Sequence, residues 1–401
     1  MIRKRVVITG LGMLCGAGKD VAEFGDALLN SRCGIEPLDL FDVSPFPSRI
    51  GSQIKGYDPL DYFDRRTAQK LSRSDQFGVI AAGEALRDSA VAGVYSPYQM
   101  GVSMGGGAAG MFQGEFWLNS LLDGKVERPS LLRGILPDQS TTDIARTFKL
   151  GGYQGTVATA CSSSSTAIGW GADLVASGRQ KMVVAGGVDT LTMLTFAGFN
   201  SLRVVDPAPC SPFSLGRQGI SLGEGAAFMT LESEEDALAR GAKIYGRVLG
   251  YSMAGEAHHM TAPDPTGLTV ARVMREALKF SSVDASMIGW VNAHGTGTPL
   301  NDAVESQAMK MVFGERALQV PLVSTKSMTG HCLGAAGAIE AVATVIALNF
   351  HIIPKTLNYR GRDPECDLEY CHSGIQKTDC KIAMSNSFAF GGNVTSLVLS
   401  L

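Results

Sequence analysis

The sequence predicts an α/β protein built from layers of helices and strands. Segments of strand and helix character alternate along nearly the whole chain, which is typical of such layers. The apolar content of 45% and the 48 glycines suit a compact fold with many tight strand–helix turns. A chain of 401 residues is long enough for two domains, or for one large double domain.

The first half of the chain alternates short apolar runs with helix-like spacing of apolar residues. Strands are predicted at 5–9, 100–104, 155–160, 181–187 and 226–231. Helices are predicted at 19–30, 68–90, 140–147 and 163–177. The segment 231–251 joins a charged helical stretch to a new strand, so it is the best candidate for a boundary.

The second half repeats this alternation. Strands are predicted near 245–252, 289–293, 321–325, 381–384 and 395–399, and helices at 267–279, 302–312 and 335–349. We therefore divide the chain into an N-terminal half, residues 1–240, and a C-terminal half, residues 241–401.

The N-terminus resembles a signal peptide at first sight, because a basic start precedes a mostly apolar run. That run contains four glycines, and Val6 to Thr9 has strand character, which favours the first strand of a sheet instead. Eight cysteines without a CxxC pair suit a reducing compartment, so we expect a cytoplasmic protein. No run approaches the length of a membrane span, and a net charge of −3 gives no argument for nucleic-acid binding.

Two other site types are disfavoured. Gly10, Gly12 and Gly16 follow a strand, as in dinucleotide-binding folds, but the required second strand ending in an acidic residue is missing, since residues 32–37 predict a loop. A cysteine-rich loop could suggest zinc, but its spacing matches no zinc knuckle, so no metal site is expected. Its four candidate ligands are Cys366, Cys371, His372 and Cys380.

Cys161 stands at the corner of a predicted strand–turn–helix unit, residues 155–178. A helix start exposes unpaired backbone N–H groups and a partial positive charge. This environment would shift the thiol toward its nucleophilic thiolate, and the same N–H groups could hold an oxyanion. The alternative is a buried, inert cysteine.

Two of the six histidines lie in similar strand–loop–helix contexts. His294 opens a loop after the strand predicted at 289–293, and His331 follows Lys326 in the turn before a long Ala-rich helix. Either histidine alone would more often be structural. Together with a cysteine at a corner they indicate nucleophilic catalysis.

Four motifs in this order and spacing resemble the active-site motifs of the β-ketoacyl-[acyl-carrier-protein] synthases. These are decarboxylating condensing enzymes of the thiolase superfamily. The motifs are TAC at 159–161, AHGTGTP at 293–299, KSMTGH at 326–331 and NSFAFGG at 386–392. The resemblance implies a thiolase fold, with two similar βαβαβαββ halves in five layers, αβαβα, and usually a homodimer.

The resemblance also implies roles for individual residues in a condensation that needs no redox cofactor and no metal. Cys161 would carry the acyl group, with the backbone N–H groups of Cys161 and Phe390 as its oxyanion hole. His294 and His331 would stabilise the enolate formed from malonyl as neutral imidazoles. The remaining residues would support them: Thr296 and Thr298 would orient the substrate, Lys326 and Glu340 would set the charge and orientation of His331, and Asp302 and Glu305 would brace the loop after His294.

Three further expectations concern access and partners. Phe390 would gate the pocket, and the small Ala108 would deepen it unless Met111 or Phe112 refills the space. The partner would be an acyl carrier protein whose phosphopantetheine arm bears the acyl and malonyl groups. The carrier is acidic, so its contacts would be basic, although a solvated helix face is the alternative. The candidate contacts are Arg65, Arg66, Lys70 and Arg73.

The chain departs from the family pattern at two places. Residues 210–220 lack an arginine and two carboxylates of the motif C-R-P-F-D-x-x-R-D-G-F, so we expect a local ion-pair network to be missing. The family's G-G-T-N is here Gly391 to Val394. A type II polyketide or polyene pathway, with a homodimer or a heterodimer of homologous subunits, therefore fits as well as fatty-acid synthesis. Two alternatives remain: a non-catalytic chain-length partner, which would lack the nucleophile, and a thiolase-like acyltransferase, which does not need the histidine pair.

Overall fold

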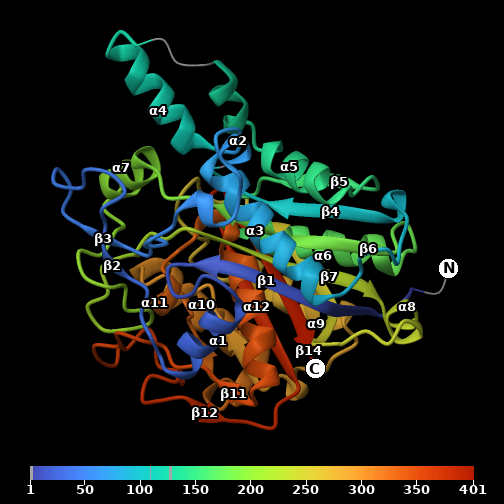
Figure 1. The fold of residues 1–401 in the computed structure, drawn as a ribbon. Coiled ribbons are helices and arrows are strands. Elements are labelled where there is room, and N and C mark those ends of the chain that lie inside the picture. Colours follow the sequence, from blue (N-terminus) through green and yellow to red (C-terminus); the bar gives the residue numbers. More distant parts are fainter. Residues whose placement is uncertain (1–2, 109, 126–128) are drawn as a thin grey trace.

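Ten strands form the scaffold of the molecule (Figure 1), whose computed structural model describes residues 3–108, 110–125 and 129–401. The strands lie in the order β10-β9-β13-β14-β8-β1-β7-β6-β4-β5. Those of the first half are β1 (Val6–Cys15), β4 (Met100–Gly105), β5 (Gln154–Val157), β6 (Met182–Asp189) and β7 (Gly225–Ser233). Those of the second half are β8 (Gly246–Gly255), β9 (Trp290–Asn292), β10 (Leu322–Val323), β13 (Ile382–Phe388) and β14 (Asn393–Ser400).

Both halves use the same strand pattern. From the middle outwards, β1 is followed by β7, β6, β4 and β5, and β8 is followed by β14, β13, β9 and β10. In each half the first two pairings are antiparallel and the last two are parallel. The two sets join where Val6 to Ile8 of β1 pair with β8. The prediction of two similar βαβαβαββ halves is confirmed, while the boundary at residue 240 stays a prediction.

The α-helices of the described residues are divided unevenly between the two halves. Those of the first half are α1 (Val21–Leu29), α2 (Arg65–Ala68), α3 (Arg73–Asp88), α4 (Met111–Leu122), α5 (Gln139–Phe148), α6 (Ser163–Ala176), α7 (Met193–Ser201) and α8 (Glu234–Ala239). Those of the second half are α9 (Leu268–Phe280), α10 (Pro299–Phe313), α11 (Lys326–Thr329) and α12 (Ala336–Asn349). Two short ribbons complete the fold: β2 (Glu36–Pro37) with β3 (Ile50–Gly51), and β11 (Ile352–Ile353) with β12 (Gln376–Lys377).

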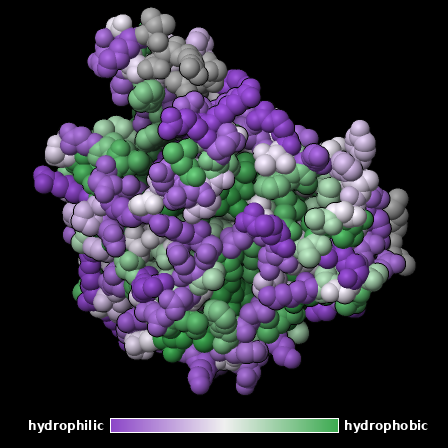
Figure 2. All heavy atoms as spheres, viewed as in Figure 1, coloured by the Kyte–Doolittle hydropathy of each residue, from purple (hydrophilic) through white to green (hydrophobic). Residues whose placement is uncertain are grey.

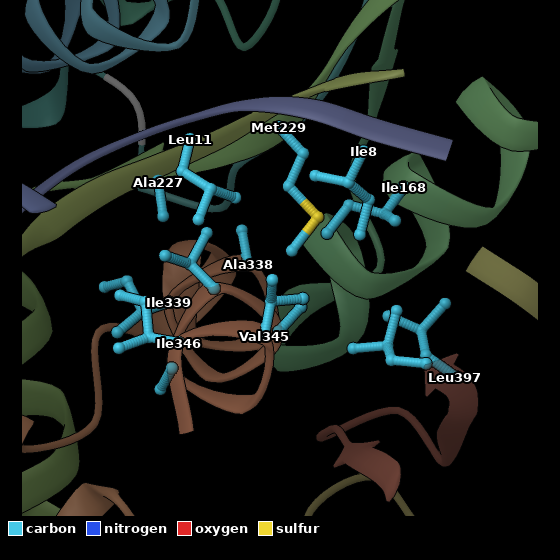
Figure 3. Packing of buried hydrophobic residues seen from close by; sticks show 14 of the residues in the cluster. Ile8, Leu11, Ile168, Ala227, Met229, Ala338, Ile339, Val345, Ile346 and Leu397 are labelled. Carbon is cyan, nitrogen blue, oxygen red and sulfur yellow. The ribbon is translucent and has the colours of Figure 1, made fainter. Parts of the chain in front are cut away.

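The central layer consists of α6 and α12, which pack between strands of both halves. Thirteen consecutive residues of α12, Ala336 to Leu348, are buried, because strands or helices cover the helix on all sides. Figure 3 shows Leu11 of β1 pointing toward α12, which carries Ile339, and Ile8 of β1 beside Ile168 of α6. The outer layers include α3 against β1 and β7, and α9 against β8 and β14.

Glycines in β1 allow α3 to approach the sheet closely. A Cβ atom at Gly10 or Gly12 would collide with the backbone carbonyl oxygens of Ala85 or Ala81 in α3. Because both glycines lie inside β1 rather than in a loop, they do not form a phosphate-binding turn. Their role in packing also explains why the predicted strand, residues 5–9, was too short.

The structure differs from the predicted elements in other places as well. The helix predicted over 68–90 is interrupted at Ser72, whose side chain and Asp75 form a capping box that begins α3. Neither α4 nor α7 was predicted. In Figure 1, α4 projects from the body of the molecule.

The surface is mixed in character. Figure 2 shows a mostly hydrophilic face interrupted by an apolar band over its middle. Helix α4 also carries four large apolar side chains that are exposed: Phe116, Leu118, Leu121 and Leu122. Of the helices in the described ranges, none is long and apolar enough to cross a bilayer.

Candidate active site

Cys161 lies in a single helical turn, residues 160–162, between β5 and α6, and is only 7% exposed. The residue before it, Ala160, has φ of 50°, in the left-handed region that an L-residue rarely adopts. The second half has an equivalent turn before α12, where Leu333 has φ of 47°. Such strain persists only where the surroundings hold it, and it is common at functional sites.

The four serines after Cys161 fix this turn in place. Ser162 and Ser163 donate hydrogen bonds back to the carbonyl oxygens of Thr159 (2.9 Å) and Ala160 (2.6 Å). The other two reach the second half: Ser164 Oγ accepts from the N–H of Ala338 in α12 (2.9 Å), and Ser165 Oγ pairs with Ser387 Oγ in β13 (2.7 Å). The polar run that looks unusual for a buried helix start therefore joins the two halves.

His294 is held by Glu305 of α10. The carboxylate of Glu305 accepts the backbone N–H groups of His294 (3.0 Å) and Gly295 (2.9 Å) and the amide of Asn386 (3.2 Å). Burial raises the pKa of Glu305 to about 7, although these hydrogen bonds lower it. Asp302 accepts the N–H of Thr296 (3.1 Å) in the same loop.

His331 is oriented by the turn that follows it. Its Nδ1 accepts a hydrogen bond from the backbone N–H of Leu333 (3.1 Å), and the backbone N–H of His331 donates to the carbonyl oxygen of Ser221 (2.7 Å). A neutral imidazole whose Nδ1 accepts must carry its proton on Nε2. His331 is therefore prepared to donate from Nε2.

The three loops meet at one cavity of about 320 Å³, lined among others by Cys161, His294 and His331. The two imidazole rings lie 5.4 Å apart, edge to face at 84°. Thr296 and Thr298 also line the cavity. The structure therefore brings together the residues expected from three remote parts of the sequence.

Lys326 contacts His294 directly, whereas the expectation linked it to His331, on which it acts through its charge. Its Nζ lies 3.2 Å from His294 Nδ1 and forms an ion pair with Glu340, and both charged side chains are 1% exposed. An ammonium donates to Nδ1, so His294 also keeps its proton on Nε2. Burial, and then the charge of Lys326, hold the pKa of both histidines well below the usual range, so both rings are neutral near pH 7.

The expectation of a thiolate at Cys161 is wrong for the resting protein. Burial raises the pKa of Cys161 to about 11, even though the charge of Lys326 and a hydrogen bond from the backbone of Phe390 lower it. The loss of solvation outweighs both of these effects. The thiol is therefore protonated at neutral pH.

The loop around Phe390 closes one side of the cavity. Its backbone hydrogen bond reaches the sulfur of Cys161, and Gly391 and Gly392 have φ of 82° and 76°, which glycine adopts easily. The cavity also contains residues that were not expected from the sequence, among them Phe199 and Glu256. Phe199 of α7 stacks on the Phe390 ring at 5.7 Å, and Glu256 lies beside the same loop, with its N–H donating to Gly392 (2.8 Å).

Neither Phe199 nor Glu256 has a sequence signal, because both reach the cavity through tertiary contacts. The Oε1 atom of Glu256 is buried and has no hydrogen-bond partner among the described residues. Burial raises the pKa of Glu256, and the backbone N–H of Asp264 lowers it.

The expected acyl-chain residues are not part of this cavity. Ala108 is buried in a neighbouring apolar cluster with Leu191 and Phe196, which shares Ile220 with the cavity wall. Met111 and Phe112 begin α4 and are half-buried outside the cavity. The cavity as it stands does not extend to any of the three.

Arg73 is not available for a partner, which corrects another expectation. Its guanidinium forms an ion pair with the fully buried Glu224 (2.5 Å) and lies over the ring of Phe77 at 4.6 Å. Arg65, Arg66 and Lys70, in contrast, are exposed. The basic patch therefore has three members, and we call these three residues the α2 patch.

A further correction concerns residues 210–220, where an ion-pair network was expected to be missing. Arg217, 5% exposed, pairs with Asp363 (2.7 Å) and lies 3.6 Å from Asp302. It also donates to the carbonyl oxygen of Pro299 (2.9 Å). Carboxylates from other segments replace those missing from the motif, and the network still braces the loop after His294.

The cysteine-rich loop forms no metal centre in the part of the chain that is described. There, no three His, Cys, Asp or Glu side chains are grouped so that they could hold an ion. All eight cysteines are free thiols.

Known proteins share this architecture over the whole chain. The sequence profile "Beta-ketoacyl synthase, N-terminal domain" matches residues 3–237, and "Beta-ketoacyl synthase, C-terminal domain" matches residues 245–360. The chain is 39% identical to a 3-oxoacyl-[acyl-carrier-protein] synthase 2 of Synechocystis sp., with 98% of this chain and 97% of the relative covered.

Solved structures agree with the sequence relatives. The ishigamide ketosynthase/chain length factor is 34% identical with a TM-score of 0.95, and 99% of each chain is covered. A ketosynthase bound to a hexaketide, in complex with its type II polyketide acyl carrier protein, is 29% identical with a TM-score of 0.91 over 99% of each chain. With the profile matches, the fold and the full-length relative in agreement, this chain belongs to the β-ketoacyl synthase family.

Proposed function

We propose that the chain catalyses the decarboxylative condensation of an acyl thioester with malonyl-[acyl carrier protein]. One observation carries the proposal: Cys161 shares a cavity with two buried imidazoles that both present Nε2–H groups. The name of the Synechocystis relative supports the reaction and its carrier. The four motifs that carry the resemblance support the roles of the individual residues.

In the first half-reaction, the sulfur of Cys161 attacks the acyl carbonyl. The backbone N–H groups of Cys161 and Phe390 hold the negative oxygen that forms. The bond to the carrier sulfur then breaks, and the proton of the Cys161 thiol ends on the released carrier thiol. Because the raised pKa keeps the Cys161 thiol protonated at rest, this proton has to leave as the sulfur attacks, and the departing carrier thiolate is the group that finally takes it.

In the second half-reaction, malonyl loses carbon dioxide, and the electron pair of the broken bond forms an enolate. Its oxygen accepts the Nε2–H groups of His294 and His331. The enolate carbon attacks the thioester on Cys161, which forms the new carbon–carbon bond and releases the cysteine as a thiolate. That thiolate takes a proton from solvent and restores the starting enzyme.

The experiment is to follow the two half-reactions separately. Intact mass after mixing with a panel of acyl carrier proteins should show one acyl group, which is lost in Cys161→Ala. Release of carbon dioxide from malonyl-[acyl carrier protein] should fall steeply in His294→Ala and His331→Ala. A chain that is never acylated would instead be a chain-length partner, and one that is acylated without releasing carbon dioxide would be a thiolase-like acyltransferase.

The proposal includes the partners and the location. The solved relatives include a ketosynthase with its carrier protein and a ketosynthase/chain length factor, which supports a carrier as substrate and a homologous subunit as companion. The α2 patch supplies the positive charge that an acidic carrier would contact. Eight free thiols support a cytoplasmic location. Comparing turnover across acyl lengths for the wild type and Ala108→Phe tests whether the cluster around Ala108 limits the chain; an unchanged length profile would reject that role.

A further inference from the structure

Asp189, the last residue of β6, carries a carboxylate with no exposed surface. Its Oδ2 accepts the backbone N–H groups of Gly107 (2.9 Å) and Gly334 (2.8 Å), and its Oδ1 accepts that of Ala108 (2.7 Å). The donors come from both halves of the chain. We call Asp189 and these three residues the Asp189 clamp.

The two sides of the clamp touch each other directly. A Cβ atom at Gly334 would lie 2.7 Å from the backbone of Gly106 and Gly107, and 2.8 Å from Asp189 Oδ2. No side chain fits there, so the turn 333–335 is pressed against the loop 106–108 with the carboxylate between them.

One side of the clamp contains the donor that orients His331. Leu333, whose N–H donates to His331 Nδ1, directly precedes Gly334 in the chain. Leu333 has φ of 47°, a strained conformation that the surroundings must hold. The bond from Gly334 to Asp189 fixes the next peptide unit of this strained turn.

We propose that Asp189 is a positioning residue for His331. By holding the turn 333–335, it keeps the N–H of Leu333 on Nδ1 of His331 and so keeps the proton of that ring on Nε2. The same carboxylate ties this turn to Ala108, behind the cavity wall. The inference rests on the proposed function, since it assumes that His331 donates to the enolate.

The test uses two substitutions at Asp189. Asp189→Asn replaces one acceptor oxygen with an NH₂ donor, so at least one backbone N–H faces another donor, while Asp189→Ala removes the three bonds to Gly107, Ala108 and Gly334. We expect release of carbon dioxide from malonyl-[acyl carrier protein] to fall about ten- to a hundredfold in Asp189→Asn, because small misplacements of a reacting group cost that much. Asp189→Ala should lose more.

Two readouts distinguish a positioning role of Asp189 from a general loss of folded protein. The ratio of carbon dioxide release to acylation of Cys161 does not depend on how much protein is folded, and it should fall in both variants. The ¹⁵N chemical shifts of labelled His331 should change toward the Nδ1–H tautomer. If both variants keep the wild-type ratio of carbon dioxide release to acylation and the Nε2–H tautomer of His331, Asp189 has no positioning role.

Glu232→Gln is the matched control. Glu232 is also fully buried and accepts hydrogen bonds from Tyr95 (2.6 Å) and Arg240, but it does not line the cavity. Its loss should lower thermal stability and leave the ratio unchanged. If the ratio falls equally in this control, the effect at Asp189 is not specific and the inference fails.

Gly334→Ala perturbs the clamp from the opposite side and decides the question if the Asp189 variants do not fold. It should lower the ratio in the same direction, and an unchanged ratio and tautomer there would overturn the inference. If the wild type releases no carbon dioxide, the proposed function fails, and the tautomer of His331 in these variants still tests the role of Asp189.

Discussion

At the scale of single residues, burial decides which proton each group of the site carries. It raises the pKa of Cys161 to about 11 and holds that of His294 and His331 well below the ordinary value. The site at rest is therefore a neutral thiol beside two neutral imidazoles. This state suits a reaction in which charge appears first on the substrate oxygen, where the Nε2–H groups can meet it.

The raised thiol pKa predicts how Cys161 reacts with iodoacetamide. Only the thiolate is nucleophilic, so the alkylation rate should rise about tenfold per pH unit between pH 7 and 9.5 and show no plateau in that range. Mass spectrometry of the peptide that contains Cys161 measures the rate, with the half-buried Cys33 as an internal comparison. A plateau already reached at pH 8 would show that the helix start lowers the pKa of Cys161 by more than burial raises it.

The pair Lys326–Glu340 predicts a separation of stability from activity. Lys326→Met alone leaves Glu340 buried without its partner, which should lower the free energy of unfolding by about 3–5 kcal/mol. Adding Glu340→Leu removes the unpaired carboxyl and should restore much of that loss.

Release of carbon dioxide from malonyl should stay low in both variants, because His294 Nδ1 has lost its donor. Urea unfolding and decarboxylation rates measure the two effects. Recovery of full activity in the double variant would show that the ammonium acts only in folding.

At the scale of elements, the sequence predicts the strands and helices that are uniformly apolar or clearly periodic. The Ala-rich α12 was expected at 335–349 and is found at Ala336–Asn349. β1 was predicted too short, because its glycines have low strand propensity and are explained only by contact with α3. Helix α4 was not predicted, because its apolar residues show little periodicity. It projects from the body of the molecule instead of packing one face on the core (Figure 1).

Close packing of α3 on β1 predicts a cost for any side chain at Gly12. In Gly12→Ala the new methyl group would collide with the Ala81 carbonyl oxygen, so we expect a loss of about 1–3 kcal/mol in the free energy of unfolding. Gly198→Ala is the control. It lies in α7, and no described neighbour comes within 4 Å of its Cβ position, so its stability should be unchanged or slightly raised. Equal stabilities of the two variants by urea unfolding would contradict this account of the β1 glycines.

At the scale of the whole molecule, the duplicated architecture carries the site. Cys161 and Gly334 occupy equivalent turns before α6 and α12. Ser164 and Asp189 each connect a segment of the first half to the second half, at Ala338 and at Gly334. The sequence predicts each turn from its local pattern. That these turns meet at one site was expected only from the family resemblance, because the two halves share no visible sequence identity. The roles of Asp189, Phe199 and Glu256 could not be predicted, since the residues next to them in the chain form no recognisable motif.

The α2 patch belongs to this largest scale, because it concerns contact with another molecule. Replacing Arg65, Arg66 and Lys70 by alanine should raise the KM for the acyl carrier protein on the order of tenfold and leave kcat nearly unchanged, since each exposed ion pair contributes about 0.2–1 kcal/mol. The wild-type KM should rise with ionic strength, and that of the variant should rise much less.

The control for the α2 patch removes three exposed cations elsewhere in the chain, Arg179, Lys377 and Lys381. Because the formal charge change is the same, it separates a local contact from a general effect of net charge. An equal rise of KM in the control variant would show that the carrier responds to the overall field of the protein. If KM rises in neither variant, the positive contact lies on another surface, and the three residues of the α2 patch form a solvated helix face.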